Sequence, residues 1–232
     1  MTRSADHAPV LMFHGVGRVE ADPFALFISP ERFHEQMRVL RALGLRGVSL
    51  GELGDAVNRR EARGLVGITF DDGYRDLLDR VPSILTQYGF TATVFAVSGL
   101  LGGENVWDPP PRRRLMDEKD LQELVGRGLE VGSHSASHVR LAGLDADRLD
   151  DEVAGSRTTL ARVTGVQPRT FCYPYGSVDA AAVEAVRAAG YSYACAVERT
   201  PGLPLHLAYP RVGVTERDWR LRFSAKLVLR GR

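Results

Sequence analysis

The sequence has few of the features that mark secreted, membrane-spanning or nucleic-acid-binding proteins. Only two of its 232 residues are cysteines, Cys172 and Cys195, and they lie in separate apolar runs, so we expect buried free thiols and no disulfide framework. The net charge of +1 gives no overall basic field and argues against nucleic acid as a partner. No apolar run reaches membrane-spanning length, and the first fifteen residues lack a sustained signal-peptide core, which predicts a cytoplasmic protein.

What remains is an ordinary globular composition, 44% hydrophobic and 25% charged, at a length that one α/β barrel domain often has. Short apolar segments alternate with helical patterns about seven times, which predicts a parallel sheet in a single domain over 1–232. The expected strands are 10–13, 47–50, 65–69, 90–97, 129–132, 169–173, 191–197 and 208–214. The expected helices are 30–43, 52–63, 74–88, 118–127, 149–163, 180–189 and a basic C-terminal helix over 215–232. Residues 17–29 and 99–114 have the composition of loops.

The segment Leu65–Gly73, LVGITFDDG, carries the strongest chemical signal. Its first five residues have the profile of a short strand buried on both faces, and Asp71 and Asp72 follow where a helical pattern is about to begin. Two neighbouring carboxylates repel each other unless a cation or a proton intervenes. On a solvated loop such a pair would be commonplace, but here the acids end a buried strand, so we interpret them as a metal or reaction site.

Other polar residues follow the ends of other expected strands, namely His14, His134–His138 and Pro174–Gly176. A closed barrel brings all such strand ends to one face, so this distribution favours a barrel over an open sheet. His134 and His138 are four residues apart, close enough for both imidazoles to reach one ion. With Asp72 they would form a site of two histidines and one carboxylate, as catalytic zinc requires. A lone H-x-x-x-H is a weak signal, and its pairing with the two acids gives it weight.

Three motifs together resemble the polysaccharide deacetylases, the NodB-like domains of carbohydrate esterase family four. They are Thr69–Gly73 (TFDDG), His134–His138 (HSASH) and Phe171–Gly176 (FCYPYG), in this order over roughly residues 65–180. The resemblance implies an α/β fold, a distorted TIM-like (β/α)7 barrel known as the NodB homology fold. It further implies a hydrolase that acts on carbon–nitrogen bonds other than peptide bonds, with a carbohydrate substrate.

The same resemblance implies a role for each motif residue. Asp71 is the general base, while Asp72, His134 and His138 bind a divalent metal, with zinc favoured and cobalt, nickel or manganese also suited to these ligands. Asp71 would take a proton from a water molecule that the metal activates, and the backbone N–H of Tyr175 would hold the oxyanion of the attacked acetamide. Tyr74, Trp107 and Tyr175 are candidate sugar-stacking residues, although each could equally belong to the core. Pro174 is a further candidate substrate contact.

The chain departs from the commoner family pattern at its general acid. The L-x-L-x-H motif usually lies near the C-terminus, whereas here the matching residues, Leu11–His14, lie near the start. This order resembles the circularly permuted branch that includes exopolysaccharide de-N-acetylases, and it assigns the general acid to His14. The rival is His206, in a proline-bracketed segment with less of a strand before it, which we interpret as a surface loop histidine.

A second departure concerns the arginine that orients the base in many relatives. Cys172 occupies its position in the third motif, so the charge must come from elsewhere. Arg211 lies in a strand-like segment and is expected to supply it from another strand end. Arg169 is nearer in sequence but begins its strand, so we expect it at the far end of the barrel. Asp218-Trp219 matches a family D-W pair, and we interpret this match as chance.

Two interpretations remain open for the C-terminal tail and for the substrate. The tail mixes apolar residues with arginines, which fits either an ordinary surface helix or a peripheral contact with an anionic membrane at its inner face. The expected substrate is an N-acetylated glycan or a lipid-linked amino sugar. The alternatives are a hydrolase of a non-sugar amide and a glycan-binding module that has lost catalysis, although retention of Asp71, Asp72, His134 and His138 argues against the second.

Overall fold

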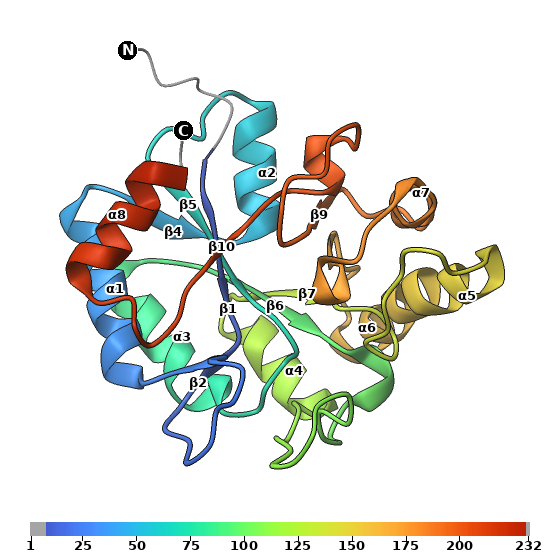
Figure 1. Cartoon of the computed structure of the whole chain (residues 1–232), viewed down its shortest axis with the longest axis horizontal. Helices are drawn as coiled ribbons and strands as arrows, with labels where there is room; N and C mark the ends of the chain where they lie inside the picture. Colours follow the sequence, from blue (N-terminus) through green and yellow to red (C-terminus); the bar gives the residue numbers. More distant parts are fainter. Residues whose placement is uncertain (1–7, 231–232) are drawn as a thin grey trace.

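A curled parallel sheet occupies the centre of the molecule, and helices surround it (Figure 1). The computed structural model describes residues 8–230 and side chains as far as Leu227, so the ends of the predicted domain and of the predicted last helix, 1–7 and 231–232, lie outside the described residues. The strands of the sheet are β1 (Val10–Phe13), β4 (Arg46–Val48), β5 (Leu65–Phe70), β6 (Thr93–Ala96), β7 (Glu130–Ser133), β8 (Thr170–Cys172), β9 (Tyr193–Cys195) and β10 (Val212–Gly213). A separate parallel pair consists of β2 (Gly15–Val16) and β3 (Phe27–Ile28).

The sheet closes on itself, as the sequence predicted. Its strands follow the order β10-β1-β5-β6-β7-β8-β9, and β4 pairs with the start of β5. At the two ends of this order, Ala196 N–H donates to the Tyr209 carbonyl and Tyr209 N–H to the Ala194 carbonyl, both at 2.9 Å. Tyr209 belongs to the segment that leads into β10, so β9 and β10 are joined and the carboxyl ends of the strands lie around one rim. The predicted distorted α/β barrel is confirmed.

The helices lie close to their predicted places. They are α1 (Pro30–Ala42), α2 (Leu50–Asn58), α3 (Leu77–Tyr88), α4 (Glu118–Gly126), α5 (Ala146–Asp150), α6 (Ser156–Thr164), α7 (Ala180–Ala188) and α8 (Arg220–Arg230). A π-helical segment, η2 (Asp151–Gly155), joins α5 to α6, and the short 3-10 turns are η1 (Ser98–Leu100), η3 (Pro174–Gly176) and η4 (Leu205–Leu207). The expected N-caps are present, since the Ser29 hydroxyl accepts the Arg32 N–H and Asp117 forms a capping box with Asp120.

Several boundaries differ from the sequence prediction for local reasons. The predicted C-terminal helix 215–232 begins only at Arg220, because residues 215–218 form a turn in which the Asp218 N–H donates to the Thr215 carbonyl at 3.0 Å. Helix α2 begins at Leu50 and not at 52, because the Ser49 hydroxyl accepts the Glu52 N–H and caps the helix early. Helix α3 begins at Leu77 and not at Tyr74, since Tyr74 is buried in the core and its backbone bridges to Leu115. The predicted loop 17–29 contains the short strand β3.

The interior is tightly packed around β5, whose residues from Val66 onward are all buried. Phe13, Phe33 and Phe70 form an aromatic cluster with ring centroids 5.3–5.5 Å apart, which fastens α1 to the sheet. Inside the barrel, a Cβ on Gly132 would lie 2.5 Å from the Thr170 hydroxyl and 2.6 Å from the Phe95 ring. This close approach explains why a glycine stands two residues before the second motif. It allows β7 to pack closely against the Thr170 and Phe95 side chains of its neighbouring strands.

The last helix is anchored by a buried carboxylate. Asp218 is fully buried, and its Oδ2 accepts the Thr215 N–H at 2.8 Å and the Lys226 ammonium at 2.6 Å. Its Oδ1 forms an ion pair with Arg222, 2.9 Å from Nε. Phe223 and Leu227 pack into the core, and α8 lies beside α1 (Figure 1). Asp218 therefore has a structural role, in keeping with the interpretation of the D-W match as chance. Among the described residues, no helix has both the length and the apolar character needed to cross a membrane.

Replacing Asp218 by Ala should lower the free energy of unfolding by about 2 kcal/mol, because Lys226 and the Thr215 N–H lose a charged acceptor. Urea denaturation measures the change. Glu31→Ala is the matched control. Within the described part of the chain Glu31 pairs with Arg18 alone, and both side chains are well exposed, so its effect should stay within about 0.5 kcal/mol. Equal stability of the Asp218→Ala and wild-type proteins would contradict the anchoring role.

Candidate active site

The predicted site residues converge at the rim formed by the carboxyl ends of the strands. Asp71 and Asp72 follow β5, His14 follows β1, and the His134–His138 loop follows β7. Tyr175 lies in η3, directly after β8, and Arg211 precedes β10. Residues up to 197 positions apart in sequence therefore contribute to one site, as the barrel interpretation required.

Three of these side chains form a compact set of candidate metal ligands. Asp72 Oδ1 lies 3.4 Å from His134 Nε2 and 3.3 Å from His138 Nε2, and all three ligand atoms lie within 4.8 Å of one another. His134 Nδ1 donates to the Cys172 carbonyl at 2.8 Å, because a carbonyl can only accept, and this directs Nε2 toward Asp72. Two imidazole nitrogens and one carboxylate with this tautomer fit a divalent metal.

Electrostatics keeps both acids ionised. Burial by itself would raise the pKa of Asp72, but hydrogen bonds to His134 and His138 outweigh it and hold that pKa well below its usual range. Burial opposes ionisation of Asp71 as well, and there the positive charge and hydrogen bonds of Arg211 lower the pKa. Each acid therefore has its own cationic or donating partner.

The second histidine of the HSASH motif is held largely by aromatic packing. The Trp107 ring stacks on the His138 imidazole, with centroids 3.9 Å apart and planes inclined by 21°, and the Tyr175 ring meets it edge-on at 4.7 Å. His138 Nδ1 is buried and has no hydrogen-bond partner among the described residues. These two rings therefore orient the imidazole where a hydrogen bond does not.

Arg211 binds the expected base directly. Its Nη1 and Nη2 donate to Asp71 Oδ1 and Oδ2 at 2.6 and 2.7 Å, while its Nε donates to the Ala196 carbonyl at 3.1 Å. Nη2 also lies 3.1 Å from Cys172 Sγ, whose small side chain leaves room for an arginine arriving from another strand. Burial raises the pKa of Cys172 well above its usual value, so this residue is a neutral thiol. The geometry places Arg211 where the sequence analysis put it.

The two candidate acids lie in different surroundings. His14 Nε2 is 4.0 Å from Asp71 Oδ2, with 19% of its side chain exposed, so it is beside the base and open to a ligand. His206 is exposed in η4, and within residues 8–227 it forms no hydrogen bond or ion pair with Asp71. The position of His14 supports its assignment over His206.

Two predicted substrate contacts are wrong because the residues are buried. Tyr74 is only 1% exposed, its ring packs on Phe27 and its hydroxyl accepts a hydrogen bond from Asn105, so no face remains for a sugar. Pro174 is also buried and serves as the first residue of η3. Tyr175 is 46% exposed, and Trp107 presents one face to His138.

Backbone strain gathers at this rim. Asp72, Ser135, His138 and Tyr175 all have left-handed φ angles, between 58° and 70°, although none is glycine. Each such residue costs about 1–2 kcal/mol and persists only where its surroundings hold it.

The sequence analysis missed two polar residues that face the strained loop, Glu152 and Ser156. Both fall on the buried face of the predicted helix 149–163, together with Leu149, Val153 and Leu160, and this misplaced polarity was the available signal.

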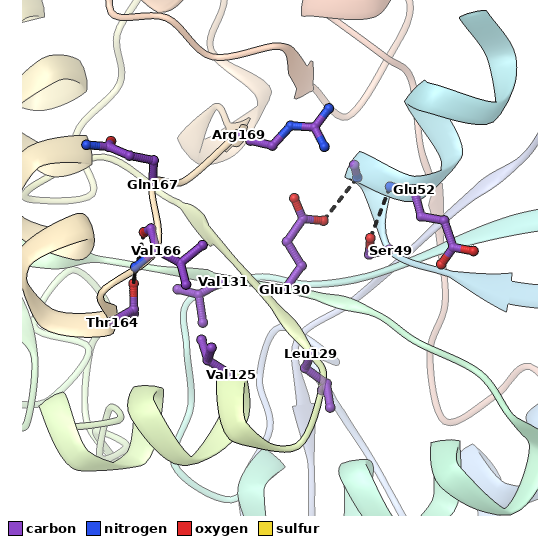
Figure 2. A pocket seen from close by; sticks show the side chains of 11 residues that line it. Ser49, Glu52, Val125, Leu129, Glu130, Val131, Thr164, Val166, Gln167 and Arg169 are labelled. Carbon is purple, nitrogen blue, oxygen red and sulfur yellow. Dashed lines mark hydrogen bonds between the residues drawn. The ribbon is translucent and has the colours of Figure 1, made fainter. Parts of the chain in front are cut away.

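A hollow lies at the opposite, amino end of the strands (Figure 2). It measures about 260 Å³ and is lined in part by Glu130 and Arg169. Glu130 accepts from the Gly51 N–H at 3.0 Å and from the Thr93 hydroxyl at 2.6 Å. Arg169 binds both carboxylate oxygens of Asp55, at 2.7 and 3.1 Å. The expected position of Arg169 far from the base is confirmed, and the polar groups here are engaged with one another.

Comparison with known proteins agrees with this geometry. Residues 58–194 match the polysaccharide deacetylase family. The chain belongs to this family. The Bacillus subtilis protein YxkH, named for the same family, is 24% identical over 192 residues, which cover 82% of this chain and 64% of that protein. The poly-β-1,6-N-acetyl-D-glucosamine N-deacetylase of Staphylococcus aureus is 22% identical over 82% of this chain and 68% of its own length. This relative agrees with the predicted resemblance to exopolysaccharide de-N-acetylases.

Solved structures confirm the fold. The structure of IcaB from Ammonifex degensii superposes with a TM-score of 0.79 at 24% identity, covering 96% of this chain and 97% of that one. The predicted NodB homology fold is thereby confirmed, including the strands that flank the matched segment 58–194.

The buried Asp71–Arg211 pair should show strong energetic coupling. In a double-mutant cycle with Asp71→Asn and Arg211→Met, we expect a coupling of about 3 kcal/mol or more, since each single change leaves a buried charge unpaired. The matched control is the equally bidentate but half-exposed Asp55–Arg169 pair, for which about 1 kcal/mol or less is expected. Urea denaturation of the two cycles provides the comparison, and equal coupling would show that burial of Arg211 does not govern the pair.

Proposed function

We propose that this protein is a divalent-metal-dependent deacetylase that removes the acetyl group from the amino sugars of an N-acetylated glycan. The observation that carries the proposal is the juxtaposition of the Asp72, His134 and His138 ligand atoms with the Asp71–Arg211 pair at one rim. Family membership supports amide hydrolysis, and relatives named for poly-β-1,6-N-acetyl-D-glucosamine and chitin support a carbohydrate substrate.

The residues of the site divide the reaction among them. When held by Asp72, His134 and His138, a divalent cation supplies Lewis acidity and lowers the pKa of a water molecule. Asp71, ionised and oriented by Arg211, accepts the proton of the attacking water. His14, beside Asp71 and open to solvent, delivers a proton to the departing amine nitrogen.

The oxyanion has a candidate donor in the third motif. The left-handed conformation of Tyr175 turns the chain sharply within η3, and the Tyr175 N–H donates to no acceptor among the described residues. A free N–H at the rim is what stabilisation of a developing negative charge requires. The ring of the same residue packs against His138, so the donor and the metal ligands are held together.

The choice of metal and substrate follows from the ligands and from the exposed aromatics. Two imidazoles and a carboxylate suit zinc best, with cobalt, nickel and manganese as alternatives. Tyr175 offers an exposed ring for a sugar face, which favours a glycan or a lipid-linked amino sugar over a small non-sugar amide. The free Tyr175 N–H and the position of His14 argue against a binding module that has lost catalysis.

Acetate release tests the activity. We expect the zinc-loaded protein to release acetate from N-acetylglucosamine oligomers or from a lipid-linked N-acetyl sugar, and to lose this activity when the metal is stripped. Asp71→Asn should lower the rate by about 100-fold or more with zinc still bound, because it removes the base and leaves Asp72, His134 and His138 in place. Asp79→Asn, an exposed acid on α3, is the control. Full activity of the Asp71→Asn variant would overturn the assignment of the base.

We further propose that α8 contacts an anionic membrane surface. The cytoplasmic location that the sequence predicts stays a prediction. Trp219 and Leu221 are 50% and 67% exposed, and Arg217 and Arg220 beside them are exposed too. Binding to phosphatidylcholine vesicles with 30 mol% phosphatidylglycerol, a composition of about physiological charge density, should weaken in a Trp219→Ser/Leu221→Ser variant. A control change at exposed Leu43 should have no effect. Equal binding by all three proteins would contradict the contact.

A further inference from the structure

The HSASH loop, His134–His138, is held from behind by a buried carboxylate. Glu152 is only 3% exposed, and its Oε2 accepts the backbone N–H groups of Ala136 at 3.0 Å and of Ser137 at 2.8 Å. Its Oε1 accepts the Ser137 hydroxyl. Three donors from two adjacent residues, lying between the two histidines, therefore converge on one side chain.

The element that carries Glu152 is unusual. Glu152 lies in the π-helical segment η2, between α5 and α6. Such wide turns are rare and are found frequently at functional sites. Ser156 follows this segment directly, and its hydroxyl lies 2.6 Å from Ser133 Oγ and donates to the Ser135 carbonyl at 3.2 Å. One wide turn thus presents two buried polar side chains to the start and to the middle of the loop.

The loop needs this support because its own backbone is strained. Ser135 and His138 adopt left-handed conformations at φ angles of 64° and 60°, and Ser135 is fully buried. Without the carboxylate, the Ala136 and Ser137 N–H groups would lose their acceptor. Charge-assisted hydrogen bonds of this kind are stronger than neutral ones. The cation nearest to Glu152 in the described structure is Arg148, 3.9 Å away and half exposed, so the loop itself is the main partner of the buried charge.

A second contact shows how closely the opposite side of the loop is fitted. The Gly99 N–H donates to the Ala136 carbonyl at 2.8 Å, and a Cβ on Gly99 would lie only 2.6 Å from that oxygen. The peptide groups of the loop are therefore bound from η1 on one side and from Glu152 on the other. A shift of the backbone at Ala136 would alter the separation of the two imidazoles.

We propose that Glu152 is a positioning residue, which sets the separation of the His134 and His138 imidazoles and so the affinity of the site for its metal. The effect on metal affinity rests on the proposed function, whereas the effect on the loop does not. Among the described residues, Glu152 makes no hydrogen bond to Asp72, His134 or His138, and it acts through the backbone of Ala136 and Ser137 and through the Ser137 hydroxyl.

Two measurements on the full chain test this role. In the metal-free protein, hydrogen–deuterium exchange of a peptide covering 134–138 should be faster in Glu152→Ala than in the wild type. Zinc affinity, measured by competition with a chromophoric chelator, should fall by about 10- to 100-fold, with a changed visible spectrum of the cobalt-substituted protein. Asp151→Ala is the matched control, because Asp151 is the exposed neighbour in the same π segment. Should Glu152→Ala fail to fold, Glu152→Gln keeps the shape and one acceptor oxygen, and it should show the same changes to a smaller extent.

The outcomes are distinguishable. Faster exchange together with weaker zinc binding in the Glu152 variant alone supports the positioning role. Unchanged exchange and unchanged affinity in a folded variant would overturn it while leaving the proposed function intact. If the wild-type protein bound no metal, the proposed function would fail, and the exchange experiment alone would then decide whether Glu152 holds the loop.

Discussion

The buried ion pair between Asp71 and Arg211 is the constraint on which the rest of the site depends. Two adjacent carboxylates end β5, and they can both be ionised in a buried place only if each has a separate positive or donating partner. Arg211 forms an ion pair with Asp71, and the two histidines contact Asp72. A buried ion pair stabilises a protein only when its geometry is good and its other hydrogen bonds are made. Here the guanidinium binds both oxygens of Asp71, and its Nε reaches the Ala196 carbonyl.

This pair also ties the architecture to the chemistry, because it connects β5 to the segment that closes the barrel. Strand β1 lies between β10 and β5, so His14, from the start of the chain, and Arg211, from near its end, both reach Asp71. The order of the motifs along the chain therefore matters less to the site than the order of the strands around the ring. A strand that carries a histidine at its carboxyl end can place that histidine beside Asp71 whether the strand is first or last in the sequence, provided that its neighbours in the sheet are the same.

Sequence reasoning succeeded where a residue's neighbours are dictated by chemistry. The acids at the end of β5 required a cation, and this requirement led to His134 and His138 without any knowledge of distances. The resemblance to relatives with an arginine beside the base led to Arg211. It failed where side-chain direction decides the outcome. Tyr74 lies two residues after Asp72, and the left-handed turn at Asp72 and Gly73 directs it into the core against Phe27. Glu152 is separated from the loop it binds by more than a dozen residues, and only its place on the apolar face of a helix distinguished it from a surface acid.

The two ends of the barrel differ in how far their polar groups are paired. At the amino end, Glu130, Arg169 and Asp55 are bound to neighbouring groups, so the polar atoms there stabilise the fold and leave little capacity for a ligand. At the carboxyl end, within the described residues, the Tyr175 N–H and His138 Nδ1 have no partner, and the Nε2 atoms of both histidines converge on one carboxylate oxygen. Unused hydrogen-bonding capacity and left-handed backbone are costly to maintain. Their concentration at one rim, braced from behind by buried polar side chains, is what a site prepared for a cation and a charged intermediate requires.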